Sequence, residues 1–119
     1  MEITSEWDDV TARLQARKAA HPALQPLVEP MLRLVEILRA DARLAAARPG
    51  LSHLSVTLRL SGIARYVIGE WHDRKPRGYA VSYVDPPLEL SDETIVPDSQ
   101  VASTIAAYLA RISRSTAPR

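Results

Sequence analysis

The chain has 119 residues, of which 46% are hydrophobic and 24% are charged, and its formal net charge is +1. This composition fits one folded domain, residues 1–119, and argues against a disordered chain. The balanced charge gives no overall attraction to nucleic acid or to an anionic membrane, and the lack of cysteine excludes disulfides and thiolate chemistry. Because no apolar run approaches the roughly 20 residues that span a bilayer, and the first residues lack an apolar leader, we expect a cytoplasmic protein.

The first predicted helix covers residues 4–20. Ser5 and Asp8 have the spacing of a capping box, in which side chains satisfy free backbone N–H groups at the helix start. The apolar residues recur at steps of three and four and therefore share one face, made of Ile3, Trp7, Val10 and Leu14. The same spacing fits a heptad seam, so this face either packs on the core or forms a homodimer.

A proline-rich connector, residues 21–30, separates this helix from a second one. The second helix is predicted to begin at Pro30, because the first turn of a helix tolerates proline. It is predicted to run to about Ala47, where the sequence Arg-Pro-Gly at 48–50 stops it. Its predicted buried stripe consists of Met31, Leu34, Val35, Leu38, Ala42 and Ala45. The opposite stripe, expected in solvent, consists of Arg33, Glu36, Arg39 and Arg43.

The chain then changes to the alternating pattern of β-strands. Residues 54–61 alternate apolar and polar side chains, which indicates a half-buried strand. Residues 63–72 are predicted to form a second strand, but strict alternation puts its apolar residues on both faces. A bulge at Gly69 would shift the alternation by one residue and bring them to one face. Residues 79–84 form a third strand, and residues 93–97 are a candidate edge strand. Short turns between consecutive strands predict an antiparallel meander.

A last helix is predicted after Asp98 or Ser99, both of which suit an N-cap. Its apolar face consists of Val101, Ile105, Tyr108, Leu109 and Ile112. The predicted fold class is therefore α+β. It has two N-terminal helices, an antiparallel meander of three to four strands and a C-terminal helix packed on the sheet.

Basic residues are concentrated in residues 70–78, between the second and third strands. The proline and glycine there are typical of a turn, so the simplest interpretation is a solvated hairpin tip. Alternatively, the tip is a phosphate-binding site made of Arg74, Lys75 and Arg77. In that case Trp71 or Tyr79 can stack on a base.

Other signatures of catalysis or ligand binding are missing from the sequence. The histidines, His21, His53 and His72, have no metal-ligand spacing, so we expect no metal site. The four glycines form no nucleotide-binding fingerprint and no nucleophile elbow occurs, so we expect no cofactor and no enzyme. The catalytic alternative is a general acid or base role for His72.

Acidic residues are concentrated in residues 85–98, which contain five acids and no Lys or Arg. A connector of this length is long for a compact domain, and loops beyond about 12 residues are often functional. Its acids either neutralise the neighbouring basic hairpin or bind a basic partner, since complementary charge selects partners. The candidate partner-binding residues are Asp85, Glu89, Asp92, Glu93 and Asp98.

The order of elements resembles that of many small bacterial immunity proteins and antitoxins. This resemblance implies a non-catalytic inhibitor that binds a basic partner, such as a nuclease, through residues 85–98. A first alternative is a subunit or adaptor of a larger bacterial assembly, which docks through the first helix or a sheet edge. A second is a small ribonuclease, since a compact sheet with preceding helices resembles the RelE/ParE toxin layout, although that family begins with a strand. It would bind and polarise phosphate through Arg65, His72, Arg74, Lys75 and Arg77, with Tyr79 or Tyr83 as partners.

Overall fold

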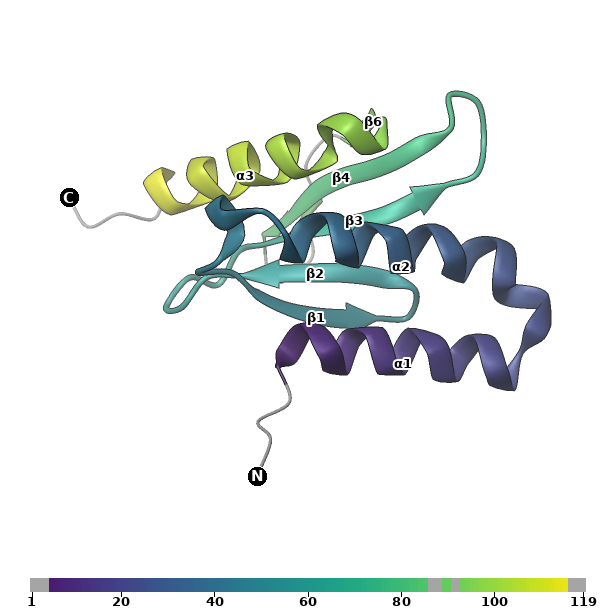
Figure 1. Cartoon of the computed structure of the whole chain (residues 1–119). Coiled ribbons are helices and arrows are strands. Elements are labelled where there is room, and N and C mark those ends of the chain that lie inside the picture. The colour runs from purple at the N-terminus through teal and green to yellow at the C-terminus, as the bar shows by residue number, and fades with distance from the viewer. Residues whose placement is uncertain (1–4, 86–88, 91–92, 116–119) are drawn as a thin grey trace.

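A computed structural model of the chain describes residues 5–85, 89–90 and 93–115 (Figure 1). The α-helices are α1 (Glu6–Ala20), α2 (Gln25–Arg39) and α3 (Asp98–Ser115), and short 3-10 helices cover Pro22–Leu24 and Ala42–Leu44. The strands are β1 (Arg48–Ser52), β2 (Ser55–Arg59), β3 (Tyr66–His72), β4 (Gly78–Asp85), β5 (Glu89–Leu90) and β6 (Thr94–Val96).

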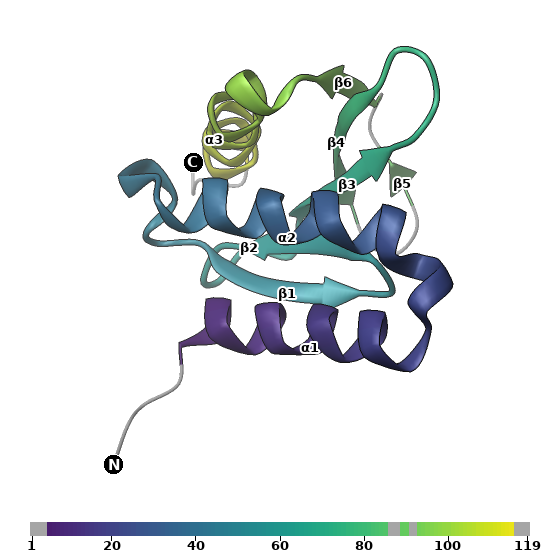
Figure 2. The ribbon, with the colours of Figure 1, turned by 45° about the vertical axis from the view of Figure 1, so that its right-hand side comes forward.

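The described strands form one antiparallel sheet with helices on one face. Strands β1 to β4 follow one another in chain order, and β5 and β6 both pair with β4, at residues 84–85 and 79–81 respectively. Helices α2 and α3 cover the same face, and α1 packs beside α2 along β1 (Figures 1 and 2). The predicted α+β class is confirmed, with six strands in the described part of the sheet instead of three to four.

The core lies between the helices and alternate residues of the strands. Val56, Val67 and Val81 are fully buried on the helix-facing side of β2, β3 and β4. The predicted bulge at Gly69 is wrong, because β3 pairs with both neighbouring strands without interruption. Gly69 faces the helices, and a Cβ atom there would lie 3.3 Å from Leu34 and 3.5 Å from Ile105. The glycine leaves room for the helix side chains to pack closely on the sheet and does not mark a change of strand direction.

The first helix follows the prediction closely. The Ser5 hydroxyl caps α1 by accepting a hydrogen bond from the Asp8 N–H at 3.1 Å. Val10 and Leu14, on the predicted apolar face, are fully buried in the core, and Trp7 is half-buried against it. This face therefore packs within the chain, while Ile3 lies outside the described residues.

The second helix begins earlier and ends earlier than predicted. It begins at Gln25 and contains Pro30, and it ends at Arg39 instead of about Ala47. The reason for the early end is Asp41, whose carboxylate accepts the Arg43 N–H at 2.9 Å and thereby starts a 3-10 turn. Ala42 and Ala45 are consequently exposed, contrary to the prediction of a buried stripe, whereas its other members, Met31, Leu34, Val35 and Leu38, are buried.

An additional strand, β1, begins where the helix was expected to stop. The Arg-Pro-Gly sequence at 48–50 belongs to this strand, which pairs with β2 over its whole length. The alternation of residues 54–61 puts Thr57 on the polar side of the predicted strand, but in the structure it is only 6% exposed. It is flanked by Gly50 and Ile68 in the neighbouring strands, and the Thr57 Oγ1 atom would lie 2.8 Å from a Cβ atom at Gly50. The close approach of β1 removes this side chain from water.

Replacing Gly78 by alanine is expected to destabilise the fold, because the new Cβ atom would lie 2.5 Å from the Val96 carbonyl oxygen of β6. Backbone atoms cannot move aside without disturbing the β4–β6 pairing, so we expect a loss of about 1–3 kcal/mol in the free energy of unfolding. Urea denaturation measures it. Gly69→Ala is the matched control, because there the neighbours are side-chain ends that can shift. An equal or larger loss in the control would contradict this explanation.

Candidate functional site

The five acidic candidates do not form one patch in the described structure. Asp85 and Glu89 are register partners at the end of β4 and the start of β5. Asp98 begins α3 just after β6, and β6 pairs with the opposite end of β4. At the usual rise of a strand, the two ends of β4 are about 20 Å apart. Glu93 is exposed just before β6, and Asp92 lies outside the described residues. The expected acidic connector thus contains two short strands that separate its acids.

The basic candidates lie at the tip of the β3–β4 hairpin, as the sequence predicted. Arg74, Lys75 and Arg77 are exposed there. The tip is held by His72, whose Nδ1 atom lies 3.1 Å from the Arg74 carbonyl oxygen and 2.9 Å from the Pro76 carbonyl oxygen. An N–H at Nδ1 can donate to these carbonyls, so the His72 side chain holds the backbone of the loop at Arg74 and Pro76.

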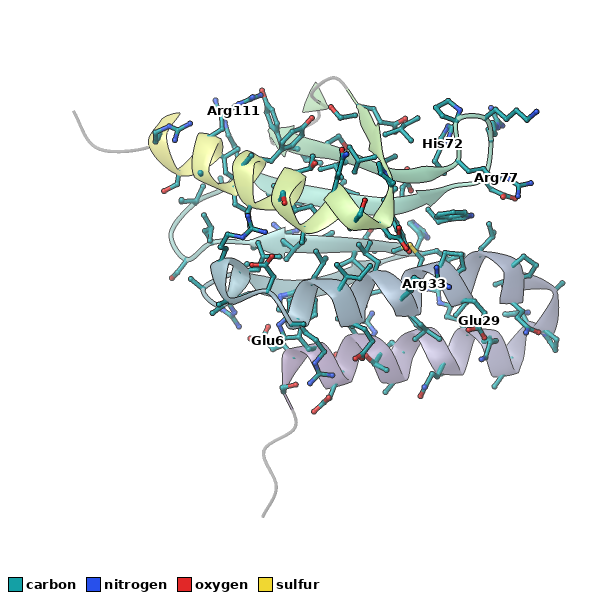
Figure 3. All side chains as sticks on the ribbon, turned by 45° about the horizontal axis from the view of Figure 1, so that its top comes forward. Glu6, Glu29, Arg33, His72, Arg77 and Arg111 are labelled. Atoms are coloured by element: carbon teal, nitrogen blue, oxygen red, sulfur yellow. The ribbon has the colours of Figure 1, made fainter. Side chains whose placement is uncertain are left out.

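Next to the tip of this hairpin, at its last strand pairs, lies an open groove between α2, the hairpin and the start of α3. It consists of two adjoining hollows of about 500 and 260 Å³, which share Arg33, Trp71 and Tyr79. We call it the Trp71 groove. Its remaining lining residues are Glu29, Pro30, Leu32, Glu36, Arg77, Gly78, Pro97 and Asp98. Figure 3 shows Glu29 and Arg33 on α2 and Arg77 on the hairpin.

The two aromatic residues of the Trp71 groove are held by α2. Trp71 and Tyr79 are register partners and contact edge to face, with ring centroids 5.2 Å apart. The backbone N–H of Trp71 donates to the Met31 sulfur at 3.2 Å, and the Tyr79 hydroxyl donates to the Pro30 carbonyl oxygen at 2.8 Å. Tyr79 is buried, while Trp71 remains half-exposed. The groove therefore has a fixed aromatic floor.

The two arginines around this floor are only loosely paired, whereas Glu29, which also lines the groove, contacts the Lys18 Nζ atom at 2.6 Å. Arg33 and Asp98 are 3.6 Å apart, and Arg77 and Asp73 are 3.8 Å apart. The two arginine side chains are 69% and 73% exposed. Exposed pairs of this kind contribute little to stability, so either arginine can exchange its partner for a group on a bound molecule. This arrangement suits non-covalent recognition of a side chain or peptide segment.

Burial raises the pKa of the Tyr79 hydroxyl above its usual value of 10. The positive charge of Arg33 lowers the same pKa and the negative charge of Asp98 raises it, both by less than burial does. Tyr79 therefore stays neutral and donates its hydrogen bond to Pro30 at physiological pH.

The sequence identified only half of the Trp71 groove. Trp71, Tyr79 and Arg77 were singled out from the hairpin, but Arg33 and Glu36 were assigned to a solvated stripe of the second helix. The spacing of Glu29, Arg33 and Glu36 does indicate one charged stripe. Nothing in the sequence indicated that this stripe adjoins the hairpin.

The described residues contain no group of three His, Asp or Glu side chains that could hold a metal ion. None of the helices described is both long and apolar enough to cross a membrane. Comparison with known protein families, with curated proteins and with solved structures finds no match for this chain.

Replacing Tyr79 by phenylalanine removes the hydrogen bond to Pro30, and we expect a loss of about 1 kcal/mol in unfolding free energy at neutral pH. The raised pKa makes this loss depend on pH. The unfolded tyrosine ionises first, near pH 10, so wild-type stability falls as the pH rises from 10 through the higher folded pKa. Denaturation of both proteins between pH 8 and 11.5 should show the difference shrinking above pH 10. A constant difference would contradict a neutral, buried hydroxyl.

Proposed function

We propose that the chain is a cytoplasmic, non-catalytic protein-binding module of the bacterial immunity or antitoxin type, and that the Trp71 groove binds a basic partner protein. The observation that carries the proposal is the grouping of Trp71 and Tyr79 with two exposed arginines around one open groove. Trp, Tyr and Arg are the residues that most often dominate the binding energy of protein interfaces. A rigid aromatic floor also lowers the entropy cost of binding.

The charge around the groove supports a basic partner. Three acids line it, Glu29, Glu36 and Asp98, with the two arginines Arg33 and Arg77. Because Glu29 is already paired with Lys18 at 2.6 Å, Glu36 and Asp98 are the acids that a basic partner would contact. Asp98 belongs to the acidic segment that the sequence singled out, and Glu93 is exposed on the same segment. Acids at the rim of an interface mainly accelerate association and reject acidic proteins. The inhibitor role itself is supported by these acids and by the order of elements.

Site-specific photo-crosslinking tests whether a partner occupies the groove. A benzophenone amino acid in place of Leu32, a groove-lining residue, is exposed to lysate of the source organism and irradiated. The same substitution at Ala46, an exposed residue that lines neither hollow, is the control. We expect mass spectrometry to identify one basic protein that is crosslinked at position 32 and not at position 46. Equal crosslinking at both positions would exclude the groove as the interface.

The partner so identified is then used in affinity measurements. Trp71→Ala should weaken binding by about 2 kcal/mol, or roughly thirtyfold in Kd, because it removes the central aromatic surface. Charge reversal at Glu93 and Asp98 should slow association, and the effect should shrink at high salt. Asp9→Lys, at an exposed acid of α1, is the control for charge and should change neither the association rate nor the affinity. Unchanged affinity in Trp71→Ala would contradict the proposal.

Two other results would favour the alternative functions. A stable assembly of several different subunits that is insensitive to Glu93 and Asp98 would indicate an adaptor. Co-purifying RNA that is lost in Arg74→Ala/Arg77→Ala, with no protein partner, would indicate a ribonuclease acting through the hairpin.

A further inference from the structure

A separate hollow, of about 410 Å³, lies where β1 begins and β2 ends. Register places Arg48 opposite Arg59, and Gly50 opposite Thr57, on the sheet face that points away from the helices. All four residues line the hollow, together with Glu6, Pro49, Leu60, Ser61, Gly62 and Ile63. We call it the Arg48–Arg59 hollow. It lies at the other end of the sheet from the hairpin tip, because Arg59 pairs with Tyr66 at the start of β3 and the tip follows the end of β3. Figure 3 shows Glu6, at the start of α1, well apart from Arg77.

The two arginines are an unfavourable pair when the hollow is empty. Like charges directly opposite each other on neighbouring strands are destabilising, and Arg48 and Arg59 are register partners. One contact offsets part of this repulsion. The Glu6 carboxylate, in the first turn of α1, lies 3.3 Å from the Arg48 Nε atom. Both side chains of that ion pair are more than half exposed, so the pair is weak and can be exchanged.

Arg59 is held in place by a different contact. Its guanidinium carbon lies 3.9 Å from the centre of the Tyr66 ring, its register partner on β3. Stacking uses the flat face of the guanidinium and leaves its N–H donors at the edge free for an acceptor. The result is one oriented arginine opposite a second arginine whose present acceptor is a single carboxylate.

We propose that the Arg48–Arg59 hollow binds a small organic phosphate. The phosphate group lies between the two guanidinium groups and replaces the Glu6 carboxylate on Arg48. A phosphate dianion offers three oxygens and neutralises two cations, which one carboxylate cannot do. The volume lies in the range of small-molecule sites, and Pro49, Leu60 and Ile63 supply apolar surface for the organic part. This site does not depend on the protein-binding groove at the other end of the sheet.

The proposal is tested by a nuclear magnetic resonance titration with phenyl phosphate. We expect saturable shifts of the backbone N–H signals of Gly50, Ser61, Gly62 and Ile63, which line the hollow. Benzoate, which has the same ring and a single-charge carboxylate, should bind at least about tenfold more weakly, as expected when one charge-assisted contact is lost. Shifts that do not saturate, or equal binding of benzoate, would overturn the proposal.

Three variants assign the binding to named side chains. Arg48→Gln and Arg59→Gln should each weaken phenyl phosphate binding about tenfold, while Arg17→Gln, at an exposed arginine near the far end of α1 that does not line the hollow, should leave it unchanged. Glu6→Gln removes the competing carboxylate and should tighten binding, whereas Glu36→Gln, the same charge change outside the hollow, should not. Equal weakening in Arg17→Gln, or weaker binding in Glu6→Gln, would overturn the assignment even if one arginine variant were unstable.

Discussion

The structure depends above all on the packing of two helices over Gly69, in the middle of β3. Leu34 of α2 and Ile105 of α3 approach the position where a Gly69 side chain would begin, at 3.3 and 3.5 Å. Both helices lie on this face of the sheet and contact each other, and the ends of the Leu34 and Ile105 side chains fill the space above Gly69. Val56 and Val81 flank Gly69 in the neighbouring strands, so one continuous core extends across three strands.

The position of α2 that results from this packing also creates the Trp71 groove. With Leu34 over Gly69, the preceding turn of α2 lies beside the hairpin, where Met31 and Pro30 accept hydrogen bonds from Trp71 and Tyr79. The outward stripe of the same helix then borders the aromatic floor with charged side chains. The packing of α2 on β3 in the core thus determines which side chains line the Trp71 groove.

The sequence was most reliable where one local signal acted alone. The cap at Ser5, the buried face of α1 and the hairpin tip all follow from short-range patterns, and the structure confirms them. Prediction of α2 was wrong at its C-terminal end because two local preferences compete there. The Asp41 carboxylate can bind its neighbours' backbone, which favours a turn, whereas the alanines after it favour a helix.

By itself, the sequence determined the α+β class, because the apolar period changes from that of a helix to that of a strand, and it determined which residues are charged. Only the tertiary structure decided which charges share a site. Arg33 and Trp71 are distant in sequence and meet because α2 packs across β3. Arg48 faces Arg59 because β1, whose proline and glycine disfavour a strand, is stabilised by pairing with β2. Such contacts arise from non-local packing energy, which periodicity and local propensity do not contain.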